Sequence, residues 1–216
     1  MTDILYLLLC FVSPIAVFVF IMLFAFRGKH SDGLTIEEMK SSEKDIQNRR
    51  REILEKAMVE REDGTHYLDP YILAKELKLE IVEDNDIPVR NRGLLDKPRN
   101  PAQYNGTIRY REKPDDKYAS NFDIVHEIMH YIYDVGVGKV VAQSFPRVHH
   151  GYRRGHKEQK IDYYAAAAAI PINELRSILQ TKGNTPDKEL ITDLMEMYRQ
   201  PKETVARRVN EVRVLA

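Results

Sequence analysis

The sequence predicts an α+β fold that is mainly helical, with a small β-sheet packed against one central helix. Three observations predict this class. Most of the chain after residue 34 divides into segments with helical apolar spacing and helix-capping residues. Only short stretches, at 79–82 and 106–111, resemble strands. The segment His126-Glu127-Ile128-Met129-His130 places two histidines one helical turn apart on a helix with an apolar face.

Length, charge and cysteine content limit what kind of protein this can be. The chain has 216 residues, which leaves room for one soluble domain of ordinary size. Lys plus Arg equals Asp plus Glu at 33 each, so the overall charge offers no general attraction to nucleic acid. Cys10, the only cysteine, lies in the first apolar run. The soluble part therefore has neither an intramolecular disulfide nor a thiolate metal site.

Residues 4–26 form an uninterrupted apolar run without a charged side chain. A helix needs about 20 residues to cross the hydrocarbon core of a bilayer. The run lacks a basic start and a small-residue cleavage site, so we expect an uncleaved transmembrane anchor. Basic residues follow the run whereas Asp3 precedes it, which predicts a single-pass protein of the cell membrane with its remaining part in the cytoplasm.

The next segment, 27–64, is expected to be a charged juxtamembrane helix and linker. Its charged stretch from Thr35 to Glu62 opens with the capping-box pattern Thr35-Ile36-Glu37-Glu38 and carries apolar residues at helical spacing. We predict a long amphipathic helix there, in one piece or two. The folded domain is then expected to span 65–216.

The first half of that domain mixes short helices and strands. Asp69-Pro70 predicts the start of a helix that ends near Leu77, and 79–82 alternates like a strand. Prolines and polar residues predict a loop over 85–101, before an edge-type strand at 106–111. Ser120 or Asn121 is expected to cap a helix over 122–134.

The second half is expected to be helical. The stretch 137–157 is irregular and basic, and an alanine-rich helix follows over 158–169, ended by Pro171. Two further helices are predicted, one from Asn184-Thr185-Pro186 to about Tyr198 and one after Gln200-Pro201.

The motif at 126–130 predicts a zinc site. Residues four apart share a helix face, so His126 and His130 can bind one ion while Glu127 reaches a water beside it. A catalytic zinc takes about three protein ligands and one water. Burying these polar side chains without a partner would be costly, which disfavours a chance match on a solvated helix. Glu127 is therefore the expected catalytic base.

The third ligand has several candidates. A metzincin pattern is excluded, because Tyr133 and Gly136 stand where its glycine and third histidine belong. Glu158 is the first candidate, because it opens the alanine-rich helix and has Asp162 one turn later on the same face. Asp162 would then accept the second ring N–H of a ligand histidine. The competing third ligands are His149, His150 and His156.

Four stretches of the chain resemble the ImmA/IrrE family of bacterial and phage metallopeptidases, with a zincin-type His-Glu-x-x-His helix. They are 69–79, 122–130, 158–171 and 194–215, the last of which looks like the family's closing helix-turn-helix-like pair. The third is the most specific, since the family has there a Glu, an Asn or Asp, an aromatic, two small residues and a Pro. In this sequence they are Glu158, Asp162, Tyr164, Ala165, Ala166 and Pro171. Asn121 and Met129 depart from the family pattern, and neither is a ligand position.

The resemblance implies a zinc metalloendopeptidase whose protein substrate is a transcriptional repressor or another regulatory protein. An amino-terminal membrane anchor is not general in the family. One rival interpretation is a zinc-binding regulatory module without turnover. Another is a membrane-tethered DNA-binding regulator that uses Arg207, Arg208 and Arg213. Apolar residues at core spacing in the last helix pair disfavour the second rival, so no direct nucleic-acid binding is expected.

Overall fold

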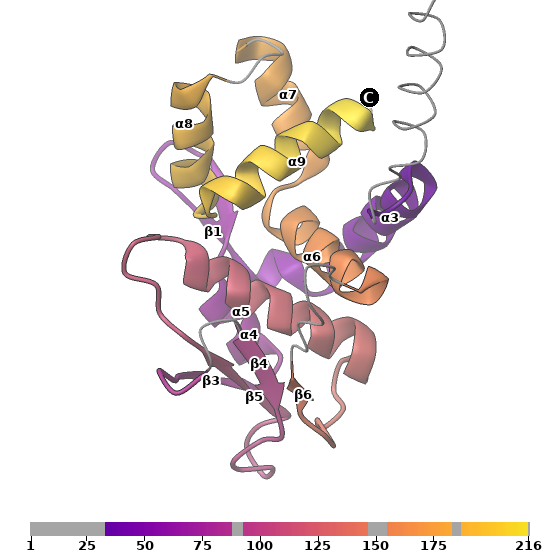
Figure 1. Ribbon diagram of the computed structural model, residues 1–216, viewed down its shortest axis with the longest axis vertical. Helices are drawn as coiled ribbons and strands as arrows, with labels where there is room; N and C mark the ends of the chain where they lie inside the picture. Colours follow the sequence, from indigo (N-terminus) through magenta and orange to yellow (C-terminus); the bar gives the residue numbers. More distant parts are fainter. Residues whose placement is uncertain (1–32, 88–92, 147–154, 183–186, 216) are drawn as a thin grey trace, which may run out of the picture. The chain divides into compact units, whose positions relative to one another are not determined.

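The computed structural model describes residues 33–87, 93–146, 155–182 and 187–215. These residues form an α+β fold that is mostly helical, as predicted (Figure 1). The expected membrane anchor at 4–26 lies outside the described residues. Within the described ranges, no helix combines the length and the apolar character needed to cross a membrane.

The described chain begins with helix α3 (Ile36–Glu52), which has the predicted capping box at its start. The hydroxyl of Thr35 accepts from the Glu38 backbone N–H at 3.2 Å, and the Glu38 carboxylate accepts from the Thr35 N–H at 2.8 Å. The helix ends ten residues before the predicted end at Glu62, because a 3-10 turn, η1 (Leu54–Ala57), turns Leu54 and Ala57 into the core. Packing therefore begins well before residue 65, inside the segment expected to be a linker.

A two-stranded sheet and a short helix follow. Strand β1 (Met58–Glu60) pairs antiparallel with β2 (His66–Leu68). Helix α4 (Pro70–Glu76) starts where predicted, because the Asp69 carboxylate accepts from the backbone N–H groups of Tyr71 and Ile72 at 2.9 and 3.1 Å. This cap fixes the helix that leads into the main sheet.

The main sheet has the strand order β3-β5-β4-β6. Its strands are β3 (Leu79–Glu83), β4 (Gly93–Asp96), β5 (Gly106–Tyr110) and β6 (Phe145–Pro146). β3 runs parallel to β5, and the other neighbouring pairs are antiparallel. Two expectations were wrong: β5 is an inner strand, and 85–101 contains β4. Leu94 and Leu95 are too few apolar residues to reveal a strand between prolines and polar residues.

Helix α5 (Ala119–His130) lies against this sheet, and α6 (His156–Ala169) packs beside it (Figure 1). No side chain caps α5: Tyr118 occupies the cap position, and the Asn121 amide donates instead to the Arg199 carbonyl at 3.0 Å. The prediction of Ser120 or Asn121 as cap was thus wrong. After His130 the chain continues as a π-helix, η2 (Tyr131–Gly136), which ends at Gly136 with φ +99°.

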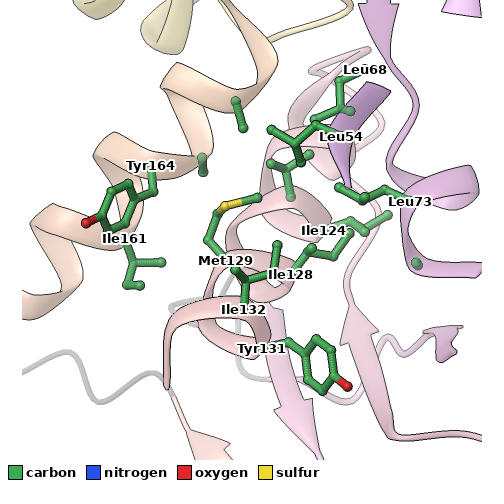
Figure 2. Packing of buried hydrophobic residues seen from close by; sticks show 14 of the residues in the cluster. Leu54, Leu68, Leu73, Ile124, Ile128, Met129, Tyr131, Ile132, Ile161 and Tyr164 are labelled. Atoms are coloured by element: carbon green, nitrogen blue, oxygen red, sulfur yellow. The ribbon is translucent and has the colours of Figure 1, made fainter. Parts of the chain in front are cut away.

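The core surrounds α5. Figure 2 shows Ile124 and Ile128 of this helix facing Leu54, Leu68 and Leu73 from η1, β2 and α4. On its other side, Met129 and Ile132 lie toward Ile161 and Tyr164 of α6. Apolar contacts on both sides thus fix how α5 is rotated about its axis, and with it the direction of the histidines.

The remaining helices share a second apolar cluster. They are α7 (Ile172–Lys182), α8 (Lys188–Tyr198) and α9 (Lys202–Val214). The cluster includes Leu175, Leu194, Val205 and Val209. α8 and α9 lie where the final helix pair was predicted, whereas α7 was not anticipated. It follows Pro171 directly, and the proline was taken only as a helix end.

Candidate metal centre

Helix α5 turns three polar side chains of the motif into the interior. His126, Glu127 and His130 are 0%, 1% and 5% exposed. Neighbouring positions Val125, Ile128 and Met129 are fully buried in the core. The helix is thus covered on nearly all sides, and polar groups so deeply buried need partners of their own.

Glu158 in the first turn of α6 reaches both histidines. Its Oε2 lies 3.5 Å from Nε2 of His126, and its Oε1 lies 3.4 Å from Nε2 of His130. The ligand atoms of these three residues all lie within 4.8 Å of one another. The structure therefore brings together the two histidines of the motif and the first candidate for the third ligand.

Two aspartates hold the outer nitrogens of the histidine rings. Asp162 of α6 places Oδ1 2.8 Å from Nδ1 of His126, at the position expected from the sequence. Asp134 of η2 places Oδ2 2.7 Å from Nδ1 of His130. Since an ionised carboxylate only accepts hydrogen bonds, both Nδ1 atoms act as donors, and in the neutral imidazole each Nε2 atom then carries the lone pair.

The donor atoms fit a metal ion. The two Nε2 atoms are 3.1 Å apart, and the Glu158 carboxylate faces both of them. Acceptor atoms so close together repel one another unless a proton or a metal ion lies between them. Ligands placed tetrahedrally at the usual zinc distances are about 3.3 Å apart, which agrees with these separations. Two imidazoles and one carboxylate are also an established donor set for catalytic zinc.

The charges of the site favour a cation as well. Burial by itself would lower the pKa of the His130 imidazole, but the hydrogen bond to Glu158 and the charge of Glu127 raise it to about 8, so a positive charge is favoured at Nε2, whether a proton or a metal ion supplies it. Burial would likewise raise the pKa of the Glu158 carboxyl, yet its hydrogen bonds to the two histidines hold that pKa well below its usual range. The cluster therefore stabilises positive charge at its centre.

Glu127 lies beside the ligands and packs against the main sheet. A Cβ atom at Gly93, the first residue of β4, would stand 2.9 Å from Cγ and 3.0 Å from Oε1 of Glu127. Contacts that short would force the carboxylate to move. The absence of a side chain at Gly93 thus leaves room for Glu127 next to the metal ligands.

Of the competing third ligands, His156 lies in the described chain, and it points elsewhere. Its Nε2 is 2.9 Å from Oε1 of Glu38 in α3, and its side chain is 59% exposed. His149 and His150 lie outside the described residues. Among the described residues, the group that can hold a metal ion is His126, His130 and Glu158.

Sequence reasoning missed Asp134, Gly93 and Lys157. Asp134 is four residues after His130, the spacing that places two side chains on one helix face, so this signal was available. The role of Gly93 depends on how a strand passes a helix far away in the sequence, which spacing does not reveal. Lys157 contacts Asp134 at 3.0 Å across two helices, which spacing equally does not reveal.

Comparison with known proteins agrees with this geometry. No curated protein matches the sequence at a significant level. The sequence model of the IrrE N-terminal-like domain, Peptidase M78, matches residues 74–210, which include α5, α6 and the three candidate ligand residues. Because the match covers more than half of the 216 residues, the chain belongs to the Peptidase M78 family of IrrE N-terminal-like domains.

Proposed function

We propose that this protein is a zinc-dependent endopeptidase. The observation that carries the proposal is the convergence of the buried His126 and His130 with the partly exposed Glu158, with Glu127 beside them. These residues lie within the matched peptidase domain. A purely structural cluster would not need a further buried carboxylate, that of Glu127, next to the three candidate ligands.

The division of roles follows from the contacts. His126, His130 and Glu158 would hold the zinc, and Asp162 and Asp134 fix the two rings. Zinc bound there would polarise the scissile carbonyl and acidify a water. Glu127 takes a proton from that water as its oxygen adds to the carbonyl carbon, and it delivers the proton to the amine nitrogen as the C–N bond breaks.

The substrate and the location are further parts of the proposal. The family resemblance favours a regulatory protein of the repressor type as substrate. The apolar run at 4–26 and the basic residues after it favour a single-pass anchor with the peptidase domain in the cytoplasm. The substrate would then be cut at the inner face of the cell membrane.

The direct test replaces Glu127 by glutamine in the full-length chain, purified in detergent. The substitution keeps the shape of the side chain and removes its basicity. We expect cleavage of a quenched-fluorescent peptide library to fall by about 10² to 10⁴-fold. Zinc content should stay at the wild-type level, because Glu127 is not a ligand.

The control is Glu189→Gln, the same chemical change on an exposed position of α8. It should leave both cleavage and zinc content unchanged. If Glu127→Gln cleaves like wild type, the proposed catalytic role is wrong. If wild type binds zinc, cuts no peptide and regulates its target equally well with Glu127→Gln, the chain is instead a zinc-binding regulatory module.

A further inference from the structure

Asp134 joins the metal site to the beginning of α6. One carboxylate oxygen, Oδ2, lies 2.7 Å from Nδ1 of His130, and the other, Oδ1, lies 3.0 Å from Nζ of Lys157. The side chain of Asp134 is 12% exposed, so its carboxylate is largely shielded from water. Both ends of this carboxylate thus have a defined partner.

The contact with His130 decides which ring nitrogen carries the proton. A neutral imidazole has one N–H and one lone pair, and only the lone pair binds a metal. The carboxylate of Asp134 has no hydrogen to donate, so it keeps the proton on Nδ1 and leaves Nε2 free toward Glu158. An asparagine amide could accept or donate there, and it would no longer favour one tautomer.

Lys157 supports Asp134 from the opposite side. It precedes the third ligand candidate, Glu158, in the first turn of α6. Its side chain is 64% exposed, so water solvates the lysine side of the ion pair, and the pair adds little stability by itself. The second oxygen of Asp134 is nevertheless fixed by this contact, which limits rotation of the carboxylate away from His130.

We propose that Asp134 is a positioning residue of the metal centre: it holds His130 in the metal-binding tautomer, and Lys157 holds Asp134. This inference deepens the proposed function and rests on its zinc site. The two histidines then have separate supports, Asp162 from α6 for His126 and Asp134 from η2 for His130. When both histidine rings are already fixed, their side chains lose less conformational freedom as the ion binds.

The test compares zinc affinity in the full-length protein in detergent, by competition with a chromophoric chelator. We expect Asp134→Asn to weaken zinc binding by about 10 to 100-fold. Lys157→Met should weaken it by less, because Asp134 stays in place. The matched control is Asp193→Asn, which breaks an ion pair of the same 3.0 Å length with Lys182, between α7 and α8. It should bind zinc like wild type.

A spectroscopic measurement separates positioning from general destabilisation. The visible absorption of bound Co²⁺ and the ¹⁵N shifts of the His130 ring should change in Asp134→Asn and remain unchanged in Asp193→Asn. If Asp134→Asn fails to fold, Lys157→Met still tests the idea. Its zinc affinity should be lower than that of wild type, and its Co²⁺ absorption and His130 ¹⁵N shifts should differ from those of wild type.

The outcomes distinguish this inference from the proposed function. Wild-type zinc binding with unchanged affinity and spectra in both Asp134→Asn and Lys157→Met overturns the positioning role alone. A wild-type chain that binds no zinc overturns the proposed function, and the positioning role with it. A loss of zinc affinity that is largest in Asp134→Asn, smaller in Lys157→Met and absent in Asp193→Asn supports both.

Discussion

The position of Glu127 depends on the absence of a Cβ atom at Gly93. Gly93 opens β4, and the Cγ of Glu127 occupies the space that a larger residue would need. The backbone at Gly93 does not require positive φ, so this glycine is needed for space and not for conformation. Catalysis by a carboxylate is sensitive to displacements of about 1 Å, which can cost about 10²-fold in rate.

Gly93→Ala is therefore expected to lower the peptidase rate by about 10²-fold while zinc content stays unchanged. Peptide cleavage per bound zinc measures the effect. The control is Gly106→Ala in β5. Its new Cβ would lie 2.7 Å from Val141, and the atoms nearest to it do not include Glu127. The Gly106→Ala variant should be less stable than wild type and should cleave peptide at the wild-type rate per bound zinc. An unchanged rate in Gly93→Ala would refute the close packing of Glu127.

The sequence revealed the site residues that act through helical spacing. His126, Glu127 and His130 stand on one helix, and Glu158 and Asp162 stand one turn apart on another. The contribution of Gly93 could not be predicted, because it arises where β4 passes α5 in space. β4 itself was hidden by its shortness and by the polar residues on either side of it.

At the scale of the elements, a buried arginine connects three helices. Arg208 of α9 is fully buried, with Nη2 2.6 Å from Oε1 of Glu43 in α3. Its Nε donates to the carbonyl of Ile170 at the end of α6 at 3.0 Å, and Nη1 lies 3.1 Å from Oε2 of Glu211. Tyr163 of α6 donates to Glu43 at 2.7 Å and completes the network. Such a residue is not available to contact a nucleic-acid phosphate.

Removing one member of a buried charged network leaves the others unpaired. Arg208→Ala should therefore lower the free energy of unfolding by about 3–5 kcal/mol. Arg213→Ala in the same helix, at a more exposed position, should change it by about 0.5 kcal/mol or less. Urea denaturation followed by circular dichroism measures both. Equal stability of the two variants would contradict the structural role of this network.

At the scale of the whole molecule, residues Leu34–Ala216 form one compact unit in which two apolar clusters meet along α6. The mainly helical α+β class and most helices could be predicted, because caps and apolar spacing are local signals. Two features could not be predicted: residues 34–57 pack into the core, and helix α7 follows Pro171. Charged residues conceal the few buried positions of α3, among them Ile46, and Pro171 gives no sign of the helix after it.

The proposed zinc site of His126, His130 and Glu158 is central at every scale. The most direct test is the metal content of the full-length protein, measured by mass spectrometry in wild type, in Glu158→Ala and in the double variant His149→Ala/His150→Ala. We predict about one zinc per chain in wild type and in the histidine double variant, and its loss in Glu158→Ala. A wild-type protein without metal under zinc-replete conditions, or full zinc content in Glu158→Ala, would contradict the account.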